Sequence, residues 1–241
     1  PDRNAEFLPL TEAEAAARTG GRLPGFKPFP DDTPEHKAFN QAQGEEILRV
    51  VLAGSGETTV VAEDLGVVPD YVPPTLLKLG IPGFRIPMFF REPDGAYADP
   101  KRYPRLSLVQ PATHDHPPLA AAWDGLWQAI NAGTEADASR RELRQIMAFA
   151  GLRDIEPPRE FAGQLHEAYS RAVLQSASWL AVFQITDLFA VTARFNTPGT
   201  VAQTNWTYRL PHTVRELEED PVRRQQAETF SRLARESGRG C

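Results

Sequence analysis

Carboxylates follow apolar segments at three points of the chain. Glu63 and Asp64 come directly after the β-branched run 58–62, and Asp115 and Asp187 each follow another apolar run. Adjacent strand residues point to opposite faces, so one of Glu63 and Asp64 can face a strand-end cleft while the other supports the loop. Burial raises the pKa of such a carboxyl and suits it to general acid catalysis. A helix cap or a lysine partner is the alternative that the spacing leaves open.

The sequence His114-Asp115-His116 has three chemical interpretations. His and Asp are metal ligands, but the other histidines are distant in sequence and no third ligand stands at motif spacing, so we expect no metal. His and Asp also hydrogen-bond the hydroxyls of a sugar ring. The third interpretation is a polar loop that caps the helix after it.

Aromatic and amide side chains cluster near the carboxyl end of the chain. Asn205, Trp206 and Tyr208 follow the turn Asn-Thr-Pro-Gly-Thr at 196–200. An aromatic face can bury the apolar side of a sugar, and core packing is the alternative. Cleavage of a glycosidic bond with retention uses two carboxyls about 5–5.5 Å apart, which acids at neighbouring strand ends can supply.

Strands alternate with helices, which predicts an α/β fold with a parallel sheet. Polar residues at the carboxyl ends of strands are typical of both a (β/α)₈ barrel and a doubly wound sheet. The spacing of Trp123 and Trp127 on one helix face indicates packing. Apolar residues at Phe39, Ile47, Leu48 and Val51 predict a buried stripe on the first helix. A helix is expected over 34–52, with Thr33 as its cap and Pro34 at its first position. A short helix is expected through 73–77 and stops at Gly80. Further helices are expected over 119–130, 139–149, 158–176 and 221–236. Expected strands cover 58–62, 83–90 and 106–110, with 179–185 a strand or a buried helix end.

The composition excludes several classes of protein. The chain has 26 Lys and Arg against 32 Asp and Glu, a net charge of −6, and 41% hydrophobic residues. This acidity speaks against nucleic acid or an anionic membrane as partner. No glycine-rich phosphate loop occurs, so we expect no nucleotide cofactor. We expect a cytoplasmic protein, because no signal peptide or long apolar run is present. We expect the thiol of Cys241, the last residue, to be solvated.

Several short motifs occur together in a fixed order. They are Ala-Glu-Asp-Leu-Gly at 62–66, Gly-Ile-Pro-Gly-Phe-Arg at 80–85, Thr-His-Asp at 113–115, Asn-Thr-Pro-Gly-Thr at 196–200 and Asn-Trp at 205–206. This ordered set resembles the 4-α-glucanotransferases (amylomaltase or disproportionating enzyme) of the α-amylase clan. The resemblance covers about residues 35–210.

The resemblance implies a (β/α)₈ barrel and transfer of α-1,4-glucan segments with retention, without a cofactor. It implies that Glu63 is the general acid/base and Asp115 the third carboxylate, which binds ring hydroxyls and stabilises the transition state. It implies substrate contacts for His114, Asn205 and Trp206. The expected substrates are maltooligosaccharides and starch- or glycogen-type glucans.

The chain also departs from the family pattern. The family's nucleophile lies in an Arg-x-Asp-His strand end upstream of the acid/base, and residues 1–62 contain no such motif. The chain begins at Pro1 rather than Met, so we interpret it as the carboxyl-terminal half of a TIM barrel with about four strands. Residues 1–33 are the expected irregular segment and 34–241 the barrel part. A non-catalytic glucan-binding fragment and an α-glucan hydrolase remain alternatives. His116-Pro117-Pro118 stands where many members have Asn-Asp-Thr, which predicts different acceptor contacts.

Overall fold

The structure is a computed structural model of the 241-residue chain that describes residues 11, 13–14, 17 and 29–239. The chain divides into two compact units, Pro1–Val51 and Leu52–Cys241. Most of the expected irregular segment 1–33 and the terminal Cys241 lie outside the described residues. None of the helices described in the structure is long and apolar enough to cross a membrane.

Helix α2 (Pro34–Gly54) contributes most of the described part of the first unit. It begins where the sequence predicts, because Thr33 accepts a hydrogen bond from the backbone N–H of His36 at 3.1 Å and Pro34 opens the first turn. The threonine cap and the proline together fix this helix start.

The predicted buried stripe on α2 is wrong. No residue of the helix is buried, and Phe39 and Val51 are each 46% exposed. Ile47 and Leu48 are half-buried. Phe29 packs edge-to-face on Phe39 with ring centres 5.0 Å apart. Hydrophobic periodicity locates an apolar face, but a face becomes buried only where another element packs on it.

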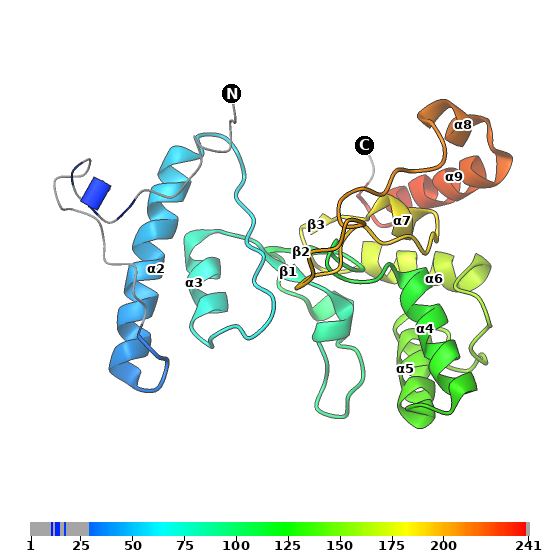
Figure 1. The fold of residues 1–241 in the computed structure, drawn as a ribbon, viewed down its shortest axis with the longest axis horizontal. Helices are drawn as coiled ribbons and strands as arrows, with labels where there is room; N and C mark the ends of the chain where they lie inside the picture. Colours follow the sequence, from blue (N-terminus) through cyan, green and yellow to red (C-terminus); the bar gives the residue numbers. More distant parts are fainter. Residues whose placement is uncertain (1–10, 12, 15–16, 18–28, 240–241) are drawn as a thin grey trace. The chain divides into compact units, whose positions relative to one another are not determined.

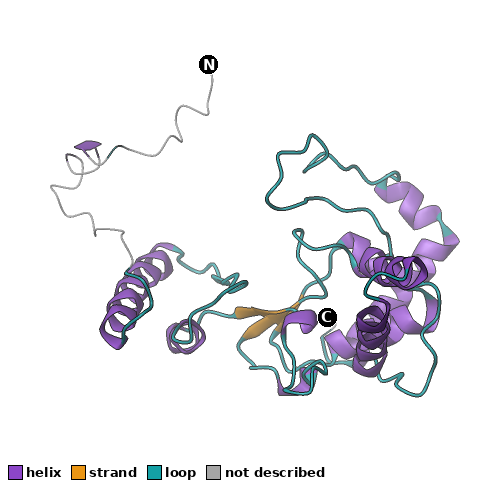
Figure 2. Cartoon of the chain, turned by 60° about the horizontal axis from the view of Figure 1, so that its bottom comes forward, coloured by secondary structure: helices purple, strands orange, loops and turns teal. Residues whose placement is uncertain are grey.

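The second unit combines a small parallel sheet with helices (Figure 1). Figure 2 shows how small the sheet is beside the helices and loops around it. The elements in chain order are α3 (Val72–Leu79), β1 (Gly83–Arg85), β2 (Ser107–Val109), α4 (Leu119–Ala132), α5 (Ala136–Phe149), α6 (Gly163–Leu174), β3 (Leu180–Ala181), α7 (Ile185–Leu188), α8 (Val214–Glu219) and α9 (Pro221–Glu236).

The three strands are parallel and lie in the order β1-β2-β3. Phe84 pairs with Leu108, and Leu108 pairs with Leu180. The expected strand 58–62 is reduced to a parallel bridge between Ala62 and Gly83, at which the Ala62 N–H donates to the Pro82 carbonyl at 2.9 Å. A segment counts as a strand only where consecutive residues form ladder hydrogen bonds. Within the described chain, this segment forms only the one bridge and is therefore not a full strand. The four strand positions nevertheless lie within the segments 58–62, 83–90, 106–110 and 179–185, of which the sequence predicts the first three as strands.

Two strands are shorter than predicted for identifiable reasons. Pro87 has no N–H to donate to a ladder and opens a 3₁₀ turn at Pro87–Phe89, so β1 ends at Arg85 instead of at residue 90. The sequence leaves open whether the segment 179–185 is a strand or a buried helix end, and the structure contains both. Its residues Leu180–Ala181 pair with β2, and α7 starts at Ile185.

The helices enclose the main hydrophobic core. Helix α4 runs beside α5, and α6 packs on α9 (Figure 1). Trp123 is fully buried and Trp127 packs at the edge of the core, which confirms the packing interpretation of this pair. Both indole N–H groups donate to the carbonyl of Pro158, at 3.1 and 3.0 Å. That carbonyl cannot also accept a helical bond, so α6 begins at Gly163 rather than at the predicted Pro158.

The carboxylate of Asp64 fixes the backbone at the start of β1. Its Oδ1 accepts from the Phe84 N–H at 2.5 Å, and its Oδ2 lies 3.4 Å from Arg85 Nη1. A Cβ on Gly83 would lie 2.4 Å from Asp64 Oδ2. Glycine at this position therefore lets the carboxylate approach the backbone, and Asp64 is the member of the Glu63–Asp64 pair that supports the loop.

A second buried carboxylate follows β3, the strand farthest from Ala62 in the pairing order. Asp187 on α7 is 2% exposed, its Oδ1 accepts from the Leu119 N–H at 2.9 Å, and its Oδ2 has no hydrogen-bond partner. Burial raises the pKa of Asp187 to about 6, while the hydrogen bond from Leu119 opposes that shift.

We expect Gly83→Ala to lower the free energy of unfolding by roughly 2–3 kcal/mol, because the new Cβ would displace the buried Asp64 carboxylate from its donors. Gly125→Ala is the matched control. Nothing lies within 4 Å of a Cβ at Gly125 in α4, and alanine favours a helix by about 0.5–1 kcal/mol. Urea unfolding of both variants measures the contrast, and equal stabilities would contradict the close approach at Gly83.

We expect Asp187→Asn to change the pH dependence of stability. The carboxyl has a higher pKa in the folded chain than in the unfolded chain, so its contribution is complete below about pH 4 and is lost as the pH rises through 6. A shift from 3.8 to about 6 corresponds to about 3 kcal/mol. In urea unfolding, the wild type should lose about that much relative to Asp187→Asn between pH 4 and pH 7. A constant difference across this range would disprove the assignment.

Candidate functional site

The predicted site residues lie on segments that follow strand positions of the second unit. Glu63 follows the Ala62 bridge, and β2 leads into residues 110–118, which we call the Asp115 loop. Parallel strands end at the same edge of a sheet, so these segments share one edge. The segment 190–208 then returns to this edge, as the bonds from Arg194 and Asn196 to Asp115 show.

Thr113 folds the Asp115 loop into a tight turn. Its hydroxyl accepts from the Asp115 N–H at 3.2 Å and lies 2.7 Å from His116 Nδ1. Its carbonyl accepts from the His116 N–H at 3.0 Å. These bonds within the loop fix the backbone on either side of His114 and Asp115.

The carboxylate of Asp115 lies among polar groups from two segments. His114 Nε2 lies 3.3 Å from Asp115 Oδ1, and Asn196 Nδ2 donates to the same oxygen at 2.6 Å. Arg194 Nη2 donates to the Asp115 carbonyl at 2.6 Å. The side chains of His114 and Asp115 remain 44% and 37% exposed, so a ligand can reach both.

Trp206 lies beside His114 in an unusual backbone conformation. Its φ of 62° is left-handed, which costs a residue other than glycine free energy and is often found at functional sites. The Trp206 N–H donates to the Phe195 carbonyl at 2.7 Å, and the indole lies 5.0 Å from the His114 ring. The residue is 65% exposed, so its apolar face is open to solvent next to His114.

Asn205 lies next to Trp206 but its side chain faces the turn. Its Oδ1 accepts from the Thr197 N–H at 3.1 Å, and its Nδ2 donates to the Thr200 carbonyl at 3.0 Å. Both ends of the amide are thus occupied by the turn, and Asn205 supports the segment that carries Trp206.

Glu63 is exposed, and none of the described residues hydrogen-bonds its carboxylate. Glu63 directly follows the parallel bridge between Ala62 and Gly83, so it lies at the same sheet edge as the Asp115 loop. Burial lowers the pKa of His116, and the negative charges of Asp115 and Glu63 oppose that shift. Glu63 therefore acts electrostatically on the same histidine as Asp115. Of the five site residues predicted from the sequence, the structure brings Glu63, His114, Asp115 and Trp206 to one sheet edge, with Asn205 behind them.

The sequence reasoning missed two side chains that hold Asp115. Arg194 and Asn196 lie two residues apart, and Asn196 is the first residue of the turn 196–200. Their alternation with the apolar Phe195 was the available signal, since residues two apart in an extended segment point to the same side.

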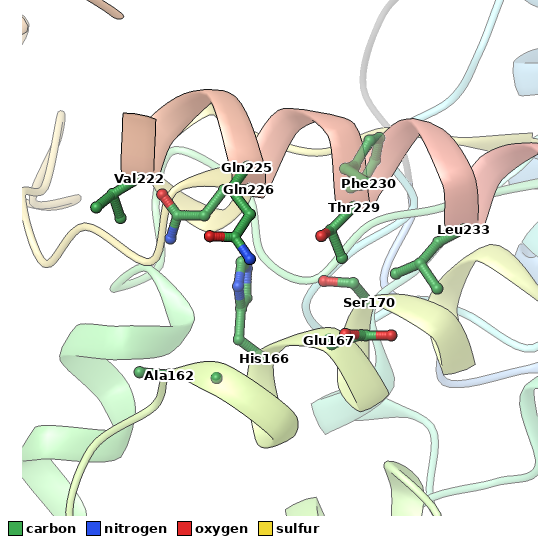
Figure 3. Close-up of a pocket in the computed structure, with 11 residues that line it drawn as sticks. Ala162, His166, Glu167, Ser170, Val222, Gln225, Gln226, Thr229, Phe230 and Leu233 are labelled. Atoms are coloured by element: carbon green, nitrogen blue, oxygen red, sulfur yellow. The ribbon is translucent and has the colours of Figure 1, made fainter. Parts of the chain in front are cut away.

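The groove between α6 and α9 is a separate cavity of about 370 Å³. In Figure 3, His166 and Ser170 of α6 point toward Gln225, Gln226 and Thr229 of α9. None of the residues lining it belongs to the Asp115 loop. The cavity is linked to the site only through intermediate residues. His166 lines the cavity and its Nε2 lies 2.7 Å from the carbonyl of Asp187, whose side chain binds Leu119 at the end of the Asp115 loop. Among the described residues, no cluster of three or more His, Cys, Asp or Glu side chains is arranged to hold a metal ion.

Comparison with solved structures identifies the fold. The amylomaltase from Streptococcus agalactiae, solved in complex with acarbose, superimposes with a TM-score of 0.58 at 22% identity, over 82% of this chain and 35% of that one. The amylomaltase from Corynebacterium glutamicum gives a TM-score of 0.56 at 21% identity, over 72% and 29%. The predicted fold class, part of a (β/α)₈ barrel, is confirmed.

Sequence comparison agrees with the fold. The 4-alpha-glucanotransferase of Chlamydia pneumoniae is 32% identical over 187 residues, which cover 73% of this chain and 32% of that protein. The enzyme of Chlamydia caviae is 31% identical over 221 residues, which cover 85% and 37%. The chain thus spans about a third of the length of the curated relatives it matches. The family model described as 4-alpha-glucanotransferase matches residues 26–214, most of the chain. Both comparisons give the same result as the ordered motifs: this chain belongs to the 4-alpha-glucanotransferase family.

Proposed function

We propose that this chain supplies part of the active site of a 4-α-glucanotransferase. The enzyme would move α-1,4-glucan segments from a donor maltooligosaccharide to glucose or another glucan with retention of configuration. The observation that carries the proposal is the Asp115 carboxylate, which lies beside His114 at the sheet edge that also carries Glu63, with the exposed Trp206 next to His114. Membership of the family and the acarbose complex of a related amylomaltase support an α-glucan as the substrate.

Glu63 would act as the general acid/base. A group with this role must meet the glycosidic oxygen directly, and the Glu63 carboxylate is exposed and has no partner among the described residues. It would protonate the departing glucan in the first step. It would then take the proton from the incoming 4-hydroxyl in the second step.

Asp115 would bind ring hydroxyls and stabilise the positive charge that develops at the anomeric carbon. The hydrogen bond from Asn196 fixes the direction of this carboxylate. His114 and Trp206 would contact the sugar next to it, with the indole against the apolar ring face. Asn205 would support the Trp206 segment instead of binding the substrate.

No residue of this chain is assigned as the nucleophile, because residues 1–62 lack an Arg-x-Asp-His strand end. This absence favours one alternative, a maltooligosaccharide-binding module that does not catalyse transfer. Hydrolysis is the other alternative and would occur if water reached the intermediate in place of an acceptor sugar.

We expect Glu63→Gln to lower the rate of maltotriose disproportionation at least about 100-fold, since the amide cannot transfer a proton. The assay detects glucose and longer maltooligosaccharides and uses both the 241-residue chain and the longest product of its reading frame. Glu57→Gln is the matched control, because Glu57 is an exposed carboxylate that precedes the strand end. It should retain full activity.

The products separate the three functions. A ladder of longer maltooligosaccharides that Glu63→Gln abolishes supports the transferase. Release of sugar without longer products supports the hydrolase. Binding of maltotriose without any turnover by either protein supports the binding module and removes the proposed role of Glu63.

A further inference from the structure

Asp187 is a buried carboxyl that the proposed chemistry does not use. Its Oδ2 is buried without a hydrogen-bond partner, and its Oδ1 accepts a single bond, from the Leu119 N–H. A buried carboxylate with one donor costs free energy relative to an apolar residue of similar size. Its position in the fold therefore requires an explanation other than stability.

The Leu119 N–H marks one end of the Asp115 loop. Leu119 is the first residue of α4, directly after residues 110–118. The other end of the loop is bound by the same short segment of chain. Gln184 Nε2 donates to the Ala112 carbonyl at 3.0 Å, so Gln184 and Asp187 hold residues 112 and 119 from one element.

The segment 184–189, which contains α7, is itself fixed from behind by α6 and α9. His166 Nε2 lies 2.7 Å from the Asp187 carbonyl, and Arg223 Nη1 donates to the Phe189 carbonyl at 2.8 Å. Burial lowers the pKa of His166, which keeps the imidazole neutral, with Nε2–H as the donor to that carbonyl. The segment thus has fixed partners on the side away from the loop.

We propose that Gln184 and Asp187 are positioning residues that set the place of Asp115 and His114 toward the bound glucan. This inference rests on the proposed function. The two side chains hold the ends of the loop, and Arg194 and Asn196 hold its centre at Asp115. A catalytic carboxylate must lie within a fraction of an ångström of its productive position, and a surface loop without ladder bonds gains that precision only from such contacts.

The test compares variants of Asp187 and Gln184 in the full chain. Asp187→Ala removes the acceptor for Leu119, and Gln184→Ala removes the donor to Ala112. Asp187→Asn retains an acceptor at Oδ1 and should rescue. Thr186→Val is the matched control, because Thr186 is fully buried on α7 and its hydroxyl has no partner. Leu233→Ala controls for lost stability, since Leu233 is buried on α9 and takes part in none of the described hydrogen bonds that hold the loop.

The first measurement is amide hydrogen exchange without sugar. We expect the amides of residues 113–116 and of Leu119 to exchange about tenfold faster in Asp187→Ala and Gln184→Ala, since a lost bond of this kind corresponds to about a tenfold change in the opening equilibrium. Asp187→Asn and Thr186→Val should match the wild type. Wild-type exchange in both alanine variants would overturn the inference, and so would equal acceleration in Leu233→Ala.

The second measurement is maltotriose binding by calorimetry, together with KM and kcat wherever the chain or its longer product is active. We expect about tenfold weaker binding, or a matching fall in kcat, in the two alanine variants only. If the wild type itself neither binds nor turns over maltotriose, the proposed function fails, and the exchange data still decide whether the two residues position the loop. Faster exchange with unchanged binding and kcat would overturn the positioning role.

Discussion

The parallel alignment of four strand positions is the constraint on which the site depends. Ala62 pairs with β1, β1 with β2, and β2 with β3, all in the same direction. The residues that follow these strands are therefore delivered to one edge, although Glu63, Asp115 and Trp206 are separated by 52 and 91 positions (115 − 63 and 206 − 115). The pairing itself is short, with three residues in β1 and β2 and two in β3. Ladder bonds set only the approximate place of the site residues.

Side chains supply the precision that the short ladder lacks. Asp64 binds the backbone of β1 beside Glu63, Gln184 and Asp187 bind the two ends of the Asp115 loop, and Asn196 binds the Asp115 carboxylate itself. Each of these bonds joins segments at least 20 residues apart in sequence. They are charge-assisted or partly buried, which makes them stronger than exposed neutral bonds. The site is therefore built from non-local polar contacts on a small apolar frame.

The sequence predicted the parts of this arrangement that depend on local rules. The cap at Thr33, the glycine that ends α3 at Gly80 and the span of α9 all follow from capping residues and periodicity. The acids at strand ends follow from the alternation of apolar runs and polar residues. The early end of β1 at Arg85 also had a local signal in the sequence, because Pro87 has no N–H to donate to the ladder. The predicted strand 83–90 did not take this proline into account.

Tertiary partners explain what the sequence could not provide. The indole N–H groups of Trp123 and Trp127 both donate to the Pro158 carbonyl, which is then not available for a helical hydrogen bond. Hydrophobic periodicity in the sequence gives no sign of these two bonds. In the sequence, Asp187 is one more acid that follows an apolar run, and nothing in the pattern distinguishes it from Asp115. Its burial and its single donor distinguish it from Asp115, whose side chain is 37% exposed. A carboxylate that is proposed to meet a substrate must be reachable from solvent, whereas a carboxylate that is proposed to hold a loop can be enclosed. Burial, rather than the place after a strand, thus separates the role proposed for Asp115 from the role proposed for Asp187.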